Sequence, residues 1–259
     1  MVILETKGVS IQFGGLRAVD DVDFAAQKGE ITSIIGPNGA GKTTLFNIIA
    51  GFYAPTRGRV FFTERDITDV KTFRRTKMGL ARTFQNINLF PDMSVMDNVL
   101  VGLHCRMKCD PISAMLNLPN KVREEKQCRE KVMEVLGFLD LADYAEEKAG
   151  SLSYGMQKNL EIARALVSDP KVLLLDEPAS GLNTHDLDEL SKRIVSIRDK
   201  GVTVVLIEHK MDVVMSISDK VMVLNFGAKI AEGTPEQIAS DPHVIAAYLG
   251  REDDADATA

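Results

Sequence analysis

A phosphate-binding loop stands out near the N-terminus. Residues 36–43 read GPNGAGKT and match the pattern G-x-x-x-x-G-K-[ST], after an apolar run at 31–35 and before a helical one. The glycines let successive N–H groups point inward at phosphate oxygens, and the helix start adds its positive end. Lys42 is expected to reach the β- and γ-phosphates, and the Thr43 hydroxyl to ligate Mg²⁺. The pattern predicts a nucleoside triphosphate site with these ligands: Gly36, Asn38, Gly39, Ala40, Gly41, Lys42, Thr43 and Thr44.

Two adjacent carboxylates end a second apolar run, VLLL at residues 172–175. A strand end beside a phosphate loop is where Mg²⁺ must be held, which suits Asp176. Glu177, one residue further on, could polarise the attacking water as a general base. Taken alone, the pair could equally be two surface acids at a strand exit. The phosphate loop elsewhere in the chain favours the chemical interpretation.

Alternating strands and helices are needed to bring these residues together. From about residue 95 to 165 the pattern becomes helical, and Val132, Val135, Leu136 and Leu139 share one helix face. The sequence therefore predicts an α/β framework interrupted by an all-α insertion. Strands are predicted at 8–13, 22–24, 31–35, 60–62, 172–175, 202–207 and 220–224, and helices at 43–51 and 186–200.

Composition excludes several classes of protein. Of the 259 residues, 45% are hydrophobic and 26% charged, which is typical of a soluble globular chain. No uninterrupted apolar stretch approaches the roughly 20 residues of a membrane span. The N-terminus lacks a secretory pattern and three cysteines offer no disulfide framework, so a cytosolic location is expected. The chain has a formal net charge of −6, and four of its acidic residues lie in the tail, 251–259, which is expected to be disordered. The rest of the chain is nearly neutral and therefore gives no support for nucleic-acid binding.

A third set of motifs lies around and between the loop and the carboxylates. Residues 152–157 (LSYGMQ), followed by EIARAL at 161–166, resemble the signature motif of ABC-type ATPases. RTFQ at 82–85, SGLN at 180–183 and IEH at 207–209 resemble further motifs of that family in the same order. The resemblance covers residues 1 to about 250. It implies a P-loop ABC-type ATPase fold with a RecA-like core, an antiparallel β subdomain and an α-helical subdomain inserted at about 95–165.

The resemblance also implies roles for single residues. Phe13 would stack on adenine, with a position in the hydrophobic core as the alternative. Gln85 would contact Mg²⁺ and the attacking water, and would relay motion to a membrane partner. His209 would hold the γ-phosphate and the geometry of Glu177. ATP and Mg²⁺ are therefore the expected ligands, and ATP hydrolysis the expected reaction.

Two such domains close head to tail in this family, with two ATP molecules between them. Ser153 and Gly155 would then contact the γ-phosphate bound by the opposite subunit, which predicts an ATP-dependent dimer. The common signature is LSGGQ; here Tyr154 replaces the first glycine and Met156 the glutamine. Activity is expected to survive, because the two phosphate-facing residues are retained. Asn183 stands where many relatives have Asp, which leaves the coupling between subunits at that turn open.

The details most resemble the longer of the two ATPases of high-affinity branched-chain amino acid importers. That likeness implies two hydrophobic permease subunits, a second ATPase subunit (a copy or a shorter relative) and, indirectly, a periplasmic or extracellular substrate-binding protein. The chain would lie at the cytoplasmic face of the cell membrane. Import of urea or amides and export of lipopolysaccharide stay open, because this subunit does not touch the cargo. The stretches that carry the likeness are 13–16, 79–86, 89–91, 152–155, 180–183, 233–236 and 247–250, with an extended segment at 107–131.

Other functions fit less well. Soluble ABC ATPases of DNA repair or translation carry two cassettes or a long coiled-coil insertion, and small-molecule P-loop kinases lack a signature motif. Zinc would need a four-ligand spacing that His104, Cys105, Cys109 and Cys128 do not offer. Eight bases at 57–82 could face a permease or an anionic membrane, or form an ordinary solvated surface. These bases are Arg57, Arg59, Arg65, Lys71, Arg74, Arg75, Lys77 and Arg82.

Overall fold

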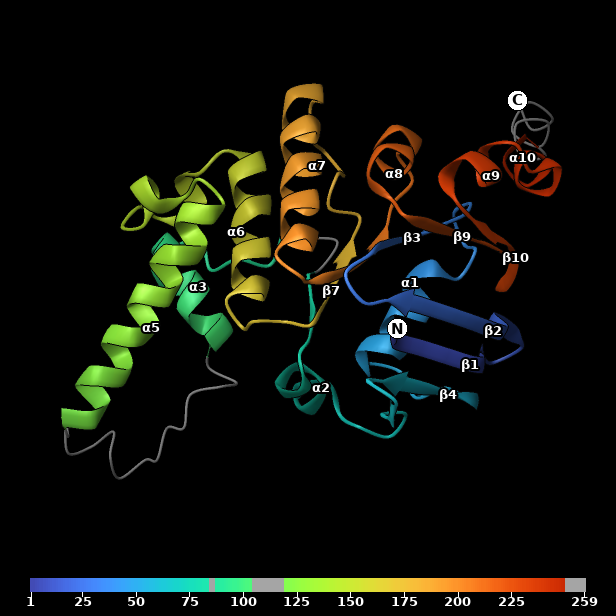
Figure 1. Cartoon of the computed structure of the whole chain (residues 1–259), viewed down its shortest axis with the longest axis horizontal. Coiled ribbons are helices and arrows are strands. Elements are labelled where there is room, and N and C mark those ends of the chain that lie inside the picture. Colours follow the sequence, from blue (N-terminus) through green and yellow to red (C-terminus); the bar gives the residue numbers. More distant parts are fainter. Residues whose placement is uncertain (84–86, 104–118, 250–259) are drawn as a thin grey trace.

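Two β-sheets and a layer of helices make up the structure, a computed structural model that describes residues 1–83, 87–103 and 119–249 (Figure 1). The six-stranded sheet lies in the middle of the molecule. The four-stranded sheet packs on one side of it, and helices α3, α5 and α6 lie together at the far end (Figure 1). This arrangement is the α/β fold with an antiparallel sheet and helical insertion that the sequence predicts.

The four-stranded sheet is antiparallel and has the order β2-β1-β4-β5. Its strands are β1 (Val2–Phe13), β2 (Leu16–Gln27), β4 (Arg57–Phe62) and β5 (Arg65–Asp66). The predicted runs at 8–13 and 22–24 are therefore too short. Register shifts interrupt the β1–β2 ladder at several points, so that the alternation of buried and exposed residues is broken and the strand pattern is hidden.

The six-stranded sheet has the order β10-β9-β3-β8-β7-β6. Its strands are β3 (Ile31–Ile35), β6 (Leu80–Arg82), β7 (Val172–Asp176), β8 (Thr203–Ile207), β9 (Lys220–Asn225) and β10 (Ala228–Gly233). All neighbours are parallel except β9 and β10. The carboxyl ends of β3, β8 and β7 therefore lie side by side at one edge, where ligands bind in open α/β sheets.

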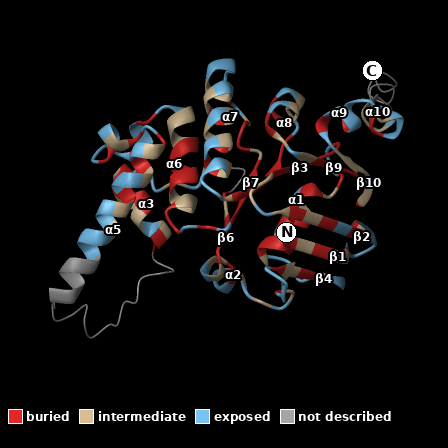
Figure 2. Ribbon diagram, in the orientation of Figure 1, coloured by how far each residue is buried: buried red, intermediate tan, exposed pale blue. Residues whose placement is uncertain are grey.

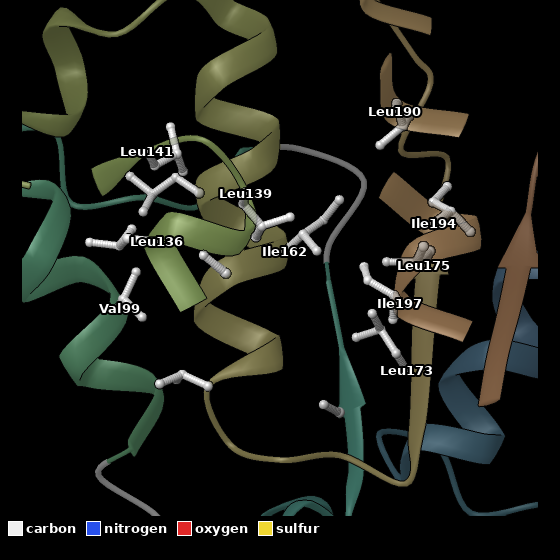
Figure 3. Packing of buried hydrophobic residues seen from close by; sticks show 14 of the residues in the cluster. Val99, Leu136, Leu139, Leu141, Ile162, Leu173, Leu175, Leu190, Ile194 and Ile197 are labelled. Carbon is white, nitrogen blue, oxygen red and sulfur yellow. The ribbon is translucent and has the colours of Figure 1, made fainter. Parts of the chain in front are cut away.

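Both faces of this sheet are covered, and its central strands are buried throughout (Figure 2). Leu173 and Leu175 pack toward Leu190, Ile194 and Ile197 of α7 (Thr184–Asp199), as Figure 3 shows. The alternate residues of β7 point to the opposite face, into a cluster shared with α1 and the antiparallel sheet. The two-sided burial explains why these strands read as continuous apolar runs.

The helical layer falls in the stretch where the sequence predicts helices. It consists of α3 (Val95–Leu103), α5 (Pro119–Phe138) and α6 (Tyr154–Leu166), with the 3₁₀ turns η1 (Ala142–Tyr144) and η2 (Ala149–Ser151). Val132, Leu136 and Leu139 are fully buried, as their spacing predicts. The remaining helices are α1 (Lys42–Ala50), α2 (Thr72–Met78), α8 (Met211–Ile217), α9 (Pro235–Ala239) and α10 (Pro242–Leu249).

Several expectations from the sequence need a correction or fall outside the structure. Arg75 and Arg82 do not belong to a basic surface, because Arg75 is buried and the Arg82 side chain is 9% exposed. Within the described part of the chain, no helix is both long and apolar enough to cross a bilayer. The expectations for Gln85, His104, Cys105, Cys109 and the tail 251–259 concern positions outside the described residues.

Candidate functional site

The phosphate loop connects β3 to α1, and its shape depends on two glycines. Gly36 has φ 147°, and a Cβ there would lie 2.1 Å from the carbonyl oxygen of Leu224. Gly41 has φ 97°, and a Cβ there would lie 2.2 Å from the carbonyl oxygen of Ala18. Any other residue at either position would push the loop away from β9 or β2, so both glycines are required by space as well as by conformation.

Lys42 opens α1 and lies under the loop. Its side chain is nearly buried, and its Nζ donates hydrogen bonds to the carbonyl oxygens of Gly36 (2.7 Å) and Pro37 (3.0 Å). The first turn of α1 contains no acidic residue, so the positive end of the helix is not offset by its own side chains. Asn38, Gly39 and Thr43 are exposed beside it. A buried cation beneath exposed loop residues is an arrangement suited to a polyphosphate.

The two carboxylates occupy different surroundings at the end of β7. Asp176 is buried and its Oδ2 accepts a hydrogen bond from Arg82 Nη2 at 2.7 Å. Arg82 is held in turn by Asn47 Oδ1, 2.7 Å from its Nη1. Burial raises the pKa of Asp176, an effect that the Arg82 hydrogen bond partly offsets. Among the described residues, the buried Oδ1 of Asp176 has no hydrogen-bond partner, so this oxygen is left for a further ligand.

Glu177 follows with a left-handed backbone (φ 47°), a conformation that costs about 1–3 kcal/mol for a residue with a side chain. Its N–H donates to the carbonyl oxygen of Ile207 at 2.9 Å, which ties the end of β7 to the end of β8. His209 Nδ1 lies 3.7 Å from Glu177 Oε2. Glu177 is 16% exposed and His209 49% exposed at their side chains. The strained backbone therefore aims a partly buried carboxylate at an accessible imidazole.

A cavity of about 450 Å³ joins the phosphate loop to Phe13 and Glu177. Phe13 is 47% exposed, which excludes the alternative of a core position, and its ring meets Tyr53 edge-on at 5.3 Å between centroids. The exposed Phe226, in the turn between β9 and β10, also lines the cavity. The sequence interpretation missed Tyr53 and Phe226, because single aromatics in turns carry no motif.

Ser153 and Gly155 do not line this cavity. Ser153 is exposed at the start of α6, where its Oγ accepts a hydrogen bond from the N–H of Met156 at 3.4 Å. The signature therefore presents a second helix N-terminus to the solvent, apart from the phosphate loop of the same chain. This separation agrees with the prediction that the motif serves another subunit, and that role stays a prediction.

Tyr154, a departure from the common signature, lies against the turn that leads to Asn183. A Cβ on Gly181 would lie 2.9 Å from the ring of Tyr154. Because the signature has a tyrosine at 154, the turn after β7 needs a glycine at 181. Asn183 caps α7 through its Oδ1, which accepts from the N–H of Asp186 at 2.9 Å, and its Nδ2 donates to Asp186 Oδ2 at 2.9 Å. An aspartate at 183 would instead place two carboxylates together. The asparagine is thus matched to its neighbour in this chain.

Two further polar residues near the site were not singled out from the sequence. Glu161 of α6 is buried and its Oε1 accepts a hydrogen bond from the N–H of Asn88 at 2.9 Å. Burial raises the pKa of Glu161. Glu208 is fully buried and accepts hydrogen bonds from backbone N–H groups on both sides of the site. Glu161 and Glu208 fall inside the motifs at 161–166 and 207–209, but only their burial in the structure distinguishes them from ordinary surface acids.

Comparisons with known proteins agree with this geometry. The family model described as "ABC transporter" matches residues 19–180, and the model described as "Branched-chain amino acid ATP-binding cassette transporter" matches residues 228–254. The chain is 43% identical over 249 residues to the high-affinity branched-chain amino acid transport ATP-binding protein BraF of Pseudomonas aeruginosa, covering 96% of this chain and 98% of that protein. It is 42% identical to LivG of Escherichia coli over the same shares of the two chains.

Solved structures show the same fold. The ADP conformation of MJ1267, an ATP-binding cassette of an ABC transporter, superposes with a TM-score of 0.86 at 36% identity, covering 96% of this chain and 99% of that one. The dimeric post-hydrolysis structure of the cassette MJ0796, bound to ADP and phosphate, has a TM-score of 0.75 at 26% identity. That match covers 90% of this chain and 99% of the other.

Proposed function

Since this chain belongs to the ABC transporter ATP-binding proteins, we propose that it hydrolyses ATP to drive a high-affinity importer of branched-chain amino acids. The observation that carries the proposal is the meeting of the phosphate loop, Asp176, Glu177 and His209 at the adjacent ends of β3, β7 and β8. The match at residues 228–254 and the two relatives support the amino acid cargo.

The residues divide the work between binding and hydrolysis. The loop N–H groups and Lys42 hold the phosphates, and the exposed ring of Phe13 offers a flat apolar face for the adenine. Glu177 takes a proton from the attacking water, as its partly buried carboxylate faces the cavity. His209, within reach of Glu177, donates to the γ-phosphate and keeps the carboxylate in place.

The residues present fit a magnesium ion. Asp176 offers a buried oxygen without a partner in the described chain, and Thr43 offers an exposed hydroxyl at the start of α1. When bound, Mg²⁺ would neutralise charge that develops on the phosphate oxygens. Arg82 holds the other oxygen of Asp176, so that only one face of the carboxylate is left for the ion. Gln85, outside the described residues, completes the proposed ligand set.

A working unit needs two ATPase subunits and two permease subunits. Ser153 and Gly155 lie away from the phosphate loop of their own chain, so we assign them to the nucleotide of the second subunit. The dimeric MJ0796 structure supports an arrangement of this kind. The second subunit is either another copy or a related ATPase, and a substrate-binding protein delivers the cargo outside the membrane.

A groove of about 500 Å³ suits the permease. It runs between the core and the helical layer, with Thr83 and Asn88 among its lining residues, and its rim carries the exposed apolar side chains Phe52, Phe90 and Val101. We assign this groove to a short amphipathic helix of a permease subunit, which would place the peripheral chain at the cytoplasmic face of the membrane. Motion of the helical layer would then reach the permease directly.

Purification of a tagged Glu177→Gln chain with ATP from membranes of the source organism tests the function. Two hydrophobic permeases together with an ATPase partner are the expected companions. The substrate-binding protein that works with this complex should bind leucine, isoleucine or valine. Recovery of the tagged chain from these membranes without any membrane protein would contradict the transporter assignment. A complex whose binding protein takes urea, amides or no amino acid would contradict the cargo alone.

A further inference from the structure

Glu208, between the end of β8 and His209, is a fully buried carboxylate. Its Oε1 accepts a hydrogen bond from the N–H of Ala179 at 2.7 Å, and its Oε2 accepts from the N–H groups of His209 (3.1 Å) and Lys210 (3.4 Å). In the described part of the chain, no ion pair joins Glu208 to a lysine, arginine or histidine side chain. Backbone donors from two loops therefore surround the carboxyl group.

The two loops that meet at Glu208 are those that carry the hydrolytic residues. Ala179 lies in the turn that starts at Glu177, and Lys210 follows His209 directly. A second contact joins the same two loops nearer the surface, because Lys210 Nζ donates to the carbonyl oxygen of Leu182 at 3.2 Å. The turn after β7 is thus joined to the loop after β8 by a buried contact through Glu208 and by a contact nearer the surface through Lys210.

The position of His209 depends on this connection. Its side chain is half exposed, so neighbouring packing constrains it weakly, and its distance from Glu177 follows mainly from where the two backbones lie. The strand pairing fixes those backbones as far as Asp176 and Ile207, and the hydrogen bond from the Glu177 N–H to Ile207 extends it by one residue. Beyond that point, the hydrogen bonds of Glu208 and the contact of Lys210 with Leu182 join the two loops.

We propose that Glu208 is a positioning residue for hydrolysis: it holds the turn of Glu177 and the loop of His209 in the relation that the reaction needs. This inference rests on the proposed function, since it assigns Glu177 and His209 to the reaction. Glu208 lies outside the residues that line the nucleotide cavity, so its role concerns the hydrolytic step rather than the binding of ATP. The turn also contains Gly181, which packs on Tyr154, so the same connection reaches the signature helix.

Glu208→Gln is the decisive substitution. A carboxylate accepts hydrogen bonds on both oxygens, whereas an amide turns one of them into an NH₂ donor that must face an N–H group. Steady-state hydrolysis and equilibrium ATP binding are measured on the purified transporter complex. We expect kcat to fall about 10- to 100-fold while KM and Kd for ATP stay within about twofold, because misplacing catalytic groups by less than an ångström has effects of this size.

Two other substitutions keep the test sharp. Lys210→Met removes the outer contact and should lower kcat by a smaller factor with the same unchanged Kd; it decides the matter if Glu208→Gln does not fold. Glu232→Gln is the control: this carboxylate is partly buried, but it pairs with Lys220 and Lys229 and none of the three lines the nucleotide cavity, so kcat should not change.

Unchanged kcat in Glu208→Gln, or in Lys210→Met where the former does not fold, would overturn the proposal. So would equal losses of binding and turnover, which indicate a merely structural role. A wild-type complex that fails to hydrolyse ATP would instead contradict the proposed function.

Discussion

The proposed function assigns Lys42 and Glu177 to different stages of the reaction, and single substitutions should separate these roles. Lys42→Ala removes the buried cation from beneath the loop, so ATP binding should weaken at least about tenfold, since hydrogen bonds to charged groups contribute about 1.5–3 kcal/mol. Glu177→Gln keeps every phosphate contact but removes the base. It should bind ATP normally and lose about 10²- to 10⁴-fold in turnover. Nucleotide binding and phosphate release measure the two effects, and normal turnover in Glu177→Gln would rule out its assignment as the base.

Glu161 makes stability depend on pH in a direction opposite to that of an ordinary ion-paired acid. Because burial raises its pKa, the folded chain holds this proton more tightly than the unfolded chain does. The stability linked to this proton is complete below the unfolded pKa, and is lost as pH rises through the raised value. Glu161→Gln keeps an acceptor for Asn88 without the charge, so its stability relative to wild type should increase from about pH 4 to pH 7. Urea unfolding at both values measures this.

Glu189→Gln provides the comparison, because the hydrogen bond from Lys192 lowers the pKa of Glu189 and reverses the sign. That variant should lose relative stability over the same interval. If Glu161→Gln showed no pH dependence relative to wild type, the raised pKa would not contribute to folding.

At the scale of the elements, Arg75 holds together parts that its place in the sequence does not suggest. Its guanidinium donates to the carbonyl oxygens of Ile48 (2.8 Å) and Ile49 (2.6 Å) at the end of α1, and to those of Val70 and Thr68, each at 2.8 Å. Burial lowers its pKa to about 10. One side chain from α2 thus donates to two carbonyl groups in the last turn of the phosphate-loop helix, where intrahelical donors run out.

Arg75→Met should destabilise the fold by about 2–4 kcal/mol, because several buried carbonyl groups would lose their donors. The neighbouring Arg74→Met provides a matched control, since Arg74 is exposed and lies over the ring of Phe73. Thermal and urea unfolding compare the two variants. Equal stability of both would show that the carbonyl groups find other partners.

At the scale of the whole molecule, the proposed function requires a second subunit to complete the site. The Glu177→Gln chain should elute as a monomer without nucleotide and as a dimer with ATP, because ATP contributes contacts to both subunits. The double variant Lys42→Ala, Glu177→Gln should stay monomeric under both conditions. Size-exclusion chromatography with light scattering distinguishes these states; an ATP-independent dimer would refute the sandwich arrangement.

The groove that we assign to the permease gives a separate prediction. Val101→Asp places a charge on its apolar rim and should abolish recovery of the permeases with the tagged chain. Met133→Asp, at an exposed apolar position of α5 outside the groove, should leave recovery unchanged. ATP binding by both variants checks that they are folded. Full recovery with Val101→Asp would show that the permease docks elsewhere.

The sequence determined the parts of this protein that depend on residues close together in the chain. The loop at 36–43, the buried strands and the one-sided helix at 132–139 are local patterns, since backbone curvature and two-sided burial impose residue types at fixed spacing. Strand β3 was predicted with the bounds it has. Strand β10 and helix α2 were missed, because every residue of β10 is half-buried and α2 buries only Arg75.

The tertiary structure alone decided which polar groups meet. Arg82 reaches Asp176 across 94 residues, and Glu208 reaches Ala179 across 29. Neither pair produces a pattern in the sequence, because such contacts arise from the order of the parallel strands and not from neighbours along the chain. The same order brings Glu177 to His209, which the motifs could name as candidates without placing them 3.7 Å apart. Local spacing thus identified the candidate residues, and the packing of β3, β8 and β7 made them one site.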